Sequence, residues 1–325
     1  MVDTAHNGWL IEEGIGEDRA ILFDHGEVIA AKVHWLSKMT ARTLLMAKII
    51  SRAPGSSRGI GTSDQGVEIM LDGLPREASE GSEVRVIITR EPMAERGRMK
   101  RAAGRYFSDE KPYTLPTNIF ADSPRIRRFP ARAWEEVWSL AAEGTMGFAG
   151  GNLTISPTPA MTLIDIDGFG SPRELALAAV PAIAQAIRQL DLAGSIGIDF
   201  PTVEAKADRK TVDAALADAL DDWPHEATAM NGFGFVQLVA RLDEPSLLHR
   251  LELSRSAACA RYLLRQAERE EGAGALLLTC HPAVQAHLKE EWLVELRTRT
   301  GREVRIEANP ALALEASQAQ IVSHD

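Results

Sequence analysis

The sequence predicts an α/β protein, α+β overall, with an N-terminal OB-type β-barrel, a central βαβ unit and a small C-terminal α+β subdomain. Three observations support this: short β-rich runs between turns near the N-terminus, two apolar runs flanking a central helical stretch, and alternating helical and β patterns near the C-terminus. A chain of 325 residues has enough core for two or three domains. The predicted boundaries are 1–95 for the barrel domain, 96–149 for a basic connecting segment, 150–250 for the central domain and 251–325 for the subdomain.

The composition is typical of a soluble globular protein, with 45% hydrophobic and 25% charged residues. No apolar run reaches membrane-spanning length, and no secretory signal is evident. Cys259 and Cys280 do not make a disulfide framework and are too far apart for a Cys-x-x-Cys metal site, so we expect a cytoplasmic protein. The formal charge of −10 argues against global attraction to nucleic acid, but it permits a local basic surface.

The N-terminal region alternates short β-rich runs with turns that contain Asp, Gly and Pro. Short strands at regular spacing are typical of a small barrel or sandwich. A five-stranded OB-type barrel fits this pattern, and so does an ordinary antiparallel sheet, because the strand pattern alone does not separate the two. The predicted strands are 19–23, 27–34, 44–50, 66–71 and 83–88.

The connecting segment concentrates basic and aromatic residues. Cations beside aromatic rings suit a single-stranded nucleic acid, because phosphates pair with Arg and Lys while bases stack on rings. The alternative is a solvated basic helix whose aromatic residues anchor a loop to the core. The basic residues are Arg96, Arg98, Lys100, Arg101, Arg105, Lys111, Arg125, Arg127 and Arg128, and the aromatic residues are Tyr106, Phe107, Tyr113, Phe120 and Phe129.

Two short apolar runs, Met161–Gly168 and Ser195–Phe200, are the most informative feature of the centre. Such continuous apolar runs are typical of strands that are buried on both faces. The stretch 171–192 between them is predicted to be a helix that packs on the sheet. Strand, helix and strand in about forty residues form a βαβ unit, whose two strands are parallel.

Acidic residues stand near the carboxyl ends of both predicted strands: Asp165 and Asp167 on the first, and Asp199 on the second. If the strands are neighbours, their backbones lie roughly 4.8 Å apart and the carboxylates can converge. Converging carboxylates repel one another unless a cation or a proton neutralises them, and such oxygen ligands suit Mg²⁺ or Mn²⁺. The sequence therefore predicts a divalent-metal site at the rim of the sheet. The alternative is that these residues are turn formers or helix caps.

The remaining elements follow from the same patterns. Strand 152–155 is expected to pair with 162–166 as a hairpin, and Lys206, Arg209 and Lys210 open a helix after Asp199. The tail from Ala308 is expected to be frayed. The other predicted elements are helix 134–142, strand 235–239, helix 256–271, strand 275–279, helix 283–289 and strand 303–307.

The central residues resemble the catalytic region of the ribonuclease E/G family. The resemblance rests on three stretches: Gly150–Asp167, Leu192–Phe200 and Phe233–Phe235. Lys48–Pro92 looks like the S1 (OB-type) RNA-binding module of that family in position and strand pattern, which makes the predicted barrel S1-like. The family consists of metal-dependent endoribonucleases, so the resemblance implies RNA processing or decay on single-stranded RNA.

The resemblance also implies roles for individual residues. Asp165 and Asp199 would be the Mg²⁺ ligands, and Asp167 stands where the family has Asn or Asp and would assist them as a third catalytic residue. A water activated by the metal would attack phosphorus, while the ion offsets charge on the phosphoryl oxygens. The candidate RNA-binding cations are Arg98, Lys100, Arg101, Lys206, Arg209 and Lys210.

The chain departs from the family pattern at several positions. Where the family has a zinc-binding Cys-x-x-Cys motif, this chain has only Cys259, so we expect no zinc and no zinc-bridged homodimer. The stretch before Gly150 is too short for the full sensor of RNA 5′ ends. Gly232, Gln237 and Ala240 stand where basic or acidic residues are common. Two other functions therefore stay open: an RNA-binding protein with weakened catalysis, and another metal-dependent phosphoesterase.

Overall fold

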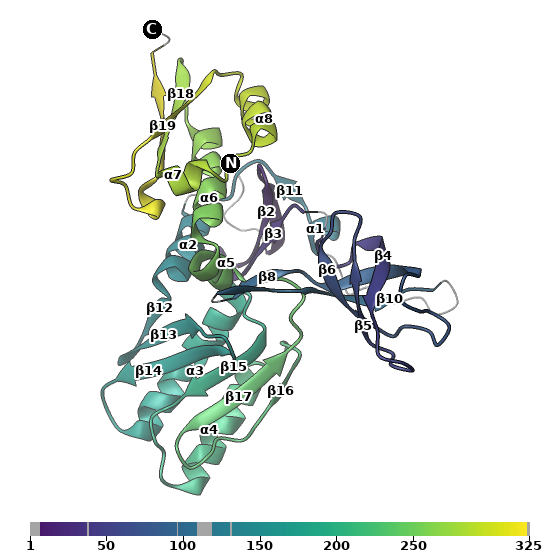
Figure 1. Cartoon of the computed structure of the whole chain (residues 1–325). Coiled ribbons are helices and arrows are strands. Elements are labelled where there is room, and N and C mark those ends of the chain that lie inside the picture. Colours follow the sequence, from purple (N-terminus) through teal and green to yellow (C-terminus); the bar gives the residue numbers. More distant parts are fainter. Residues whose placement is uncertain (1–6, 38, 96, 109–118, 131, 324–325) are drawn as a thin grey trace.

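The computed structural model describes residues 7–37, 39–95, 97–108, 119–130 and 132–323. Arg96, Lys111 and Tyr113 of the predicted basic segment lie outside these residues. The C-terminal subdomain and the central sheet stand at opposite ends of the molecule, and the barrel projects to one side (Figure 1). Within the described ranges, no helix has the length and apolar character needed to cross a membrane.

The first strands form a separate sheet, so the predicted barrel domain 1–95 is corrected. Side chains of this sheet, such as Leu10 and Ile21, belong to the main core and not to the core of the barrel. Gln189, the last residue of the central helix Pro172–Gln189, donates a hydrogen bond to the Val28 carbonyl at 2.6 Å. This bond ties the first sheet to the central domain. The strands are β1 (Gly8–Glu13), β2 (Glu17–Asp24), β3 (Glu27–Trp35) and β11 (Arg125–Ile126), in the order β11-β1-β2-β3.

The five-stranded barrel is closed and begins only at Leu44. Its strands are β4 (Leu44–Ser51), β5 (Gly59–Thr62), β6 (Glu68–Asp72), β7 (Glu83–Arg90) and β10 (Ala102–Tyr106), in the order β10-β6-β5-β4-β7. The last strand runs parallel to β6 and antiparallel to β7, which closes the sheet in the Greek-key order of an OB barrel. Ile49, Ile69 and Val86 fill its interior, which is a core distinct from that of the remaining molecule.

The predicted connecting segment 96–149 is not one unit, because its residues belong to three different parts of the fold. The hairpin of β8 (Met93–Glu95) and β9 (Arg98–Lys100) leaves the barrel, and β10 returns to close it. Further on, α1 (Ile119–Asp122) leads to β11, and α2 (Ala133–Glu143) buries Trp134 and Trp138 in the main core. Sequence composition grouped these residues, whereas strand pairing separates them.

The central sheet confirms the predicted βαβ unit. β14 (Thr162–Gly168) and β15 (Gly194–Asp199) are parallel neighbours joined by α3 (Pro172–Gln189), and β13 (Gly151–Pro157) forms the predicted hairpin with β14. The other members are β12 (Thr145–Phe148), β16 (His225–Ala227) and β17 (Phe235–Ala240), in the order β12-β13-β14-β15-β17-β16. With the barrel, this gives a mixed α+β protein.

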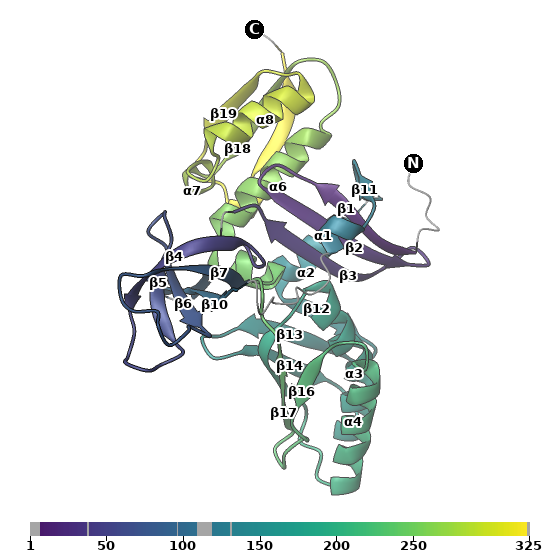
Figure 2. The same cartoon turned by 90° about the vertical axis from the view of Figure 1, so that its right-hand side faces the viewer.

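Helices α3 and α4 (Lys206–Ala219) lie together on one face of this sheet (Figure 2). α3 begins with Ser171, whose hydroxyl accepts from the Glu174 N–H, followed by Pro172 in the first turn. The two helices bury Ile183, Ile187 and Val212 against the sheet. This arrangement covers one face and directs the functional residues to the other.

The ordered secondary structure of the C-terminal subdomain extends further along the chain than predicted. The tail after Ala308, expected to be frayed, forms β20 (Gln318–Val322), which pairs antiparallel with β18 (Ala275–Cys280). The predicted single helix 283–289 is replaced by two helices. The remaining elements are α5 (Leu247–Leu253), α6 (Arg255–Arg269), α7 (Pro282–Gln285), α8 (Glu290–Thr300), β19 (Val304–Ala308) and the 3₁₀ turn η1 (Leu314–Ala316).

A buried ion network joins the first sheet to α6. Glu12 Oε1 accepts from Arg19 Nη1 at 3.1 Å and from Arg265 Nε at 2.6 Å, and all three side chains are at most 5% exposed. Arg265 Nη1 also donates to Glu135 Oε1 of α2 at 2.6 Å. Burial alone would raise the pKa of Glu12, but Arg19 and Arg265 outweigh it and lower that pKa, so the carboxyl is ionised at neutral pH.

Candidate functional site

The central sheet carries polar side chains on the face opposite α3 and α4. Along β14, Ile164 and Ile166 are buried in the core, whereas Asp165 and Asp167 are exposed on the other face. This alternation follows from the two-residue repeat of a strand. Both aspartates that the sequence placed on this strand therefore point to an open surface.

One row of residues crosses the open face. Asp165 of β14 is paired directly with Asp199 of β15 in the parallel register. On one side, Thr154 of β13 is opposite Asp165, and on the other side, Phe235 of β17 is opposite Asp199. The two predicted metal ligands are thus neighbours on adjacent strands, whose backbones are roughly 4.8 Å apart.

The Asp165–Asp199 pair has the chemistry of a divalent-metal site. Both side chains are exposed, and no hydrogen bond or ion pair of either carboxylate is found among the described residues. Like charges on directly opposite residues of a sheet repel one another, so a cation between them would be stabilising. Two carboxylates with open space around them leave room for the waters that Mg²⁺ retains. The donor set therefore fits this ion.

Asp167 does not join the pair at one point, contrary to the expectation that three carboxylates converge. It lies two residues further along β14 and is opposite Asn152 of β13. Among the described residues, the three aspartates do not form a group whose ligand atoms all lie within 4.8 Å of one another. The group that meets this distance lies elsewhere, at His34, Glu91 and Glu244. Asp167 and Asn152 instead form a second polar pair beside the first.

Sequence reasoning missed several residues of the open face because their position depends on strand register. Thr154 and Asn152 reach the site from β13, and Gln237 of β17 is opposite Gly197, one step below the aspartate row. A Cβ at Gly197 would lie 2.6 Å from Phe235 Cζ and 2.8 Å from Met161 Sδ, so these side chains cover that glycine. The aspartate pair therefore adjoins a small apolar floor.

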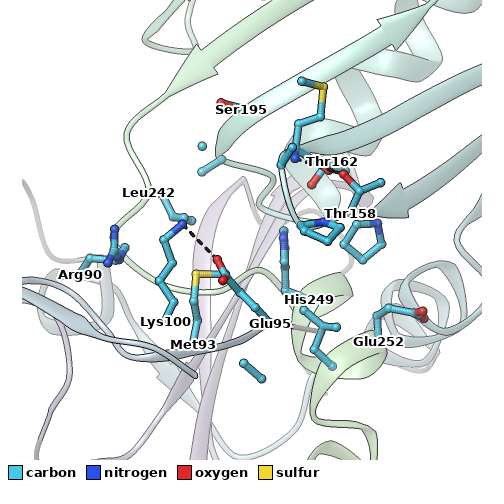
Figure 3. A pocket seen from close by; sticks show the side chains of 18 of the residues that line it. Arg90, Met93, Glu95, Lys100, Thr158, Thr162, Ser195, Leu242, His249 and Glu252 are labelled. Carbon is cyan, nitrogen blue, oxygen red and sulfur yellow. Dashed lines mark hydrogen bonds and ion pairs between the residues drawn. The ribbon is translucent and has the colours of Figure 1, made fainter. Parts of the chain in front are cut away.

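A cavity of about 550 Å³ opens at the amino end of the same strands (Figure 3). Its lining includes Arg90 and Lys100 from the barrel side, and Met161, Ser195 and Val239 from the sheet. The last three share the strand alternation of the aspartates, so they belong to the same face of the sheet, four residues before Asp165, four before Asp199 and opposite Ser195 respectively. The cavity therefore lies between the β8–β9 hairpin and the amino end of the open face.

The candidate cations of the hairpin are already partly neutralised. Arg98 Nε lies 2.6 Å from Glu95 Oε2, and Lys100 Nζ lies 3.4 Å from Glu95 Oε1, the contact drawn in Figure 3. Arg101 pairs with Glu68 of the barrel. All three remain at least 39% exposed, so phosphate can still reach them. Exposed ion pairs of this kind are weak and exchange partners at little cost.

The cations after β15 have different environments. Arg209 Nη1 donates to the carbonyls of Val203 at 2.8 Å and Glu204 at 2.6 Å, so this side chain fastens the loop that follows Asp199. Lys206 and Lys210 are exposed on the first turns of α4. α4 packs on the covered face, which places these lysines at the edge of the sheet and not on the open face.

A second cluster with metal-ligating groups lies where the barrel joins the other parts. Ligand atoms of His34, Glu91 and Glu244 lie within 4.8 Å of one another. Arg42 Nη1 lies 3.6 Å from Glu244, and Arg250 Nη2 lies 3.3 Å from Glu91, so cations of the protein already balance the carboxylates. Burial raises the pKa of Glu91 to about 7 despite these cations. We interpret the cluster as an ion-pair junction.

Cys259, which the sequence resemblance aligns with the zinc motif but which lies outside the matched residues 136–241, is buried on α6. Burial, with a smaller contribution from Glu315, raises the pKa of this thiol to about 12. Zinc binds the thiolate, which such a site disfavours.

A tight turn before β17 brings the chain back beside Asp199. Asn231 Oδ1 accepts from the N–H groups of Phe233 at 2.8 Å and Phe235 at 3.1 Å. Gly234 has a φ of +94°, and a Cβ there would lie 2.3 Å from the Phe200 carbonyl oxygen. A Cβ at Gly232, by contrast, would have no neighbouring atom within 4 Å. Gly232 can therefore serve as the control position for a substitution at Gly234.

We expect Gly234→Ala to lower the free energy of unfolding by about 1–3 kcal/mol, because it combines backbone strain with a clash. Gly232→Ala should change it by about 0.5 kcal/mol or less. Urea denaturation followed by tryptophan fluorescence measures both. Equal stabilities of the two variants would show that the turn tolerates a side chain at Gly234.

The comparison with known families agrees with this geometry. The model of the Ribonuclease E/G family matches residues 136–241. That range contains the whole six-stranded sheet with α3, α4 and the aspartate pair. No curated protein matches the chain. The resemblance seen in the sequence is confirmed for this part of the molecule.

Proposed function

We propose that this member of the ribonuclease E/G family is a Mg²⁺-dependent endoribonuclease that cuts single-stranded RNA. The observation that carries the proposal is the direct cross-strand pairing of Asp165 with Asp199 on the open face of the family-matched sheet. The proposed setting is RNA processing or decay in the cytoplasm. Mn²⁺ is an alternative ion, and a homodimer, if one forms, would not be bridged by zinc.

In this proposal the residues of the open face have different roles. Asp165 and Asp199 would hold the ion with their carboxylates. When bound, Mg²⁺ supplies a water activated for attack on phosphorus and offsets charge on the phosphoryl oxygens. Asp167, one step along β14, and Asn152, opposite it on β13, would orient the first carboxylate and its waters. Gln237, one step the other way, offers an amide to a ribose or phosphate oxygen.

The surface between the barrel and the sheet would hold the RNA strand. Arg98 and Lys100 on the hairpin, with Arg101 at its end, would present cations to phosphates, and the cavity beside Lys100 is also lined by Met161, Ser195 and Val239 of the aspartate-bearing sheet. The OB order of the barrel is typical of folds that bind oligonucleotides on their strand surface. We therefore assign the barrel an S1-like role in holding single-stranded RNA.

The experiment that tests this function incubates the purified full chain with an end-labelled single-stranded RNA, with Mg²⁺ or with EDTA. We expect internal cuts only with the metal, and much slower cutting of a duplex of the same sequence. Binding without cutting would favour an RNA-binding protein with weakened catalysis. A chain that neither binds nor cuts RNA, but hydrolyses small phosphoesters with Mg²⁺, would be another metal-dependent phosphoesterase.

A further inference from the structure

Two exposed phenylalanines stand at the edge of the sheet beside the aspartate pair. Phe169 is 91% exposed and Phe233 is 82% exposed. Every other Phe, Tyr and Trp side chain whose burial the structure describes is buried or half-buried. A phenyl ring in water forgoes the stabilisation that burial would give, so two such rings at one place indicate a surface used for binding.

The two rings lie at the rim of the sheet beyond the aspartate row, one on each side of β15. Phe169 is the first residue after β14 and lies four residues beyond Asp165. Phe233 precedes Phe235, the residue opposite Asp199, by two residues. In the sheet, β15 with Asp199 lies between β14, which leads to Phe169, and β17, which follows Phe233. A strand of RNA that runs along this rim, past Asp199 at the end of β15, would therefore meet both rings.

The backbone holds both residues while it leaves the rings free. The Phe169 N–H donates to the Gly150 carbonyl at 3.0 Å, and glycines on both sides of Phe169 offer its ring no side chain to pack on. Phe233 is fixed by the Asn231 side chain and by Gly234, as described above. Aromatic groups on fixed backbone lose little entropy when a ligand stacks on them.

We propose that Phe169 and Phe233 form a stacking platform for the unpaired bases on the two sides of the phosphodiester that is cut. This inference rests on the proposed function and adds the way in which the substrate is positioned. Every base presents an aromatic face, so the platform would favour unpaired RNA over a duplex and would give little sequence preference. The six strands of the central sheet, all within the described residues, contain no Lys or Arg, so stacking would supply affinity where phosphate contacts are few.

The test measures binding of a fluorescent single-stranded RNA to the full chain carrying Asp199→Asn, in EDTA, so that cutting is suppressed during the measurement. Phe169→Leu and Phe233→Leu should each weaken binding roughly 5- to 100-fold, because each removes a stacked base. Phe233→Trp should bind at least as tightly as the parent, since it keeps a ring. For an otherwise identical RNA with abasic positions, the Leu variants should bind like the parent. The salt dependence should be unchanged, because no phosphate contact is lost. Val294→Ala, an exposed apolar residue on α8, is the control.

The outcomes separate this inference from the function on which it rests. If the Asp199→Asn protein with both rings intact is as stable as the wild type but does not bind RNA, and the wild type does not bind RNA either, the proposed function fails. If it binds RNA and the Leu variants bind equally well, only the stacking platform is refuted. Loss of a dimer in size-exclusion chromatography, with RNA affinity unchanged, would assign the rings to contact with a second copy and would also overturn the inference.

Discussion

Asp199→Asn and Asp165→Asn are each expected to reduce Mg²⁺-dependent RNA cleavage by roughly 10²- to 10⁴-fold while RNA binding stays nearly intact. The pair lies side by side on β14 and β15, so either substitution removes half of the charge that would hold the ion. A metal ion contributes several kcal/mol of transition-state stabilisation, and about 1.4 kcal/mol corresponds to a factor of ten in rate. Single-turnover cleavage of labelled RNA measures the effect.

Stability measurements provide an independent readout for the same variants. Mg²⁺ should raise the melting temperature of the wild-type protein, because it binds the folded state, and should have little effect on either variant. Without metal, each variant should be as stable as the wild type or more stable by about 0.2–1 kcal/mol, because the cross-strand repulsion is relieved.

Asp167→Asn is the matched control on the same strand. It lies opposite Asn152 and outside the pair, and the resemblance allows Asn at this position, so cleavage should fall far less than for Asp165→Asn. A wild-type rate for Asp199→Asn would refute the metal site. An equal loss of RNA binding and of stability in Asp199→Asn would instead indicate that the sheet no longer folds.

The largest effect on stability is expected for Arg265→Met. Arg265 is 2% exposed and donates to both Glu12 and Glu135, so its loss leaves the buried Glu12 carboxylate and the partly exposed Glu135 carboxylate short of a partner. Breaking a buried ion pair in this way costs about 3–5 kcal/mol. Urea denaturation followed by fluorescence measures it, since none of the six tryptophans lies between residues 36 and 133, where the barrel is found.

Two comparisons test the cause of this loss. Arg297→Met, in an exposed ion pair with Glu290 on α8, should cost at most about 1 kcal/mol. The double variant Arg265→Met with Glu12→Gln should recover part of the lost stability, because it removes the carboxylate that was left without its partner. If Arg265→Met is no more destabilising than Arg297→Met, the network around Glu12 does not hold the first sheet to α6.

The Glu12 network also makes the stability of the fold depend on pH. The pKa of Glu12 is lowered in the folded protein from its ordinary value of 4.5, so the ionised carboxylate stabilises the fold above that value. This contribution is lost as the pH falls through the lower pKa of the folded state.

The agreement between sequence and structure is best where the information is local. Met161–Gly168, the helix after Ser171 and Ser195–Phe200 were predicted as a βαβ unit, because an apolar run, a cap and a second apolar run each specify their own element. The family match covers the same residues. The barrel was predicted as a type of fold, but its extent was not, because alternating strands do not show which neighbours they pair with.

The sequence by itself determined the strands, the helix between them and the acidic residues at their ends, because side-chain periodicity and chain order are properties of the sequence. Only the tertiary structure decided that Asp165 is opposite Asp199, that Asp167 is instead opposite Asn152, and that Phe169 and Phe233 are exposed at the same rim of the sheet. It also decided that residues 8–35 form a sheet separate from the barrel and that the C-terminal tail pairs with β18. The physical reason is that register and strand order depend on packing between distant segments, which no local pattern contains.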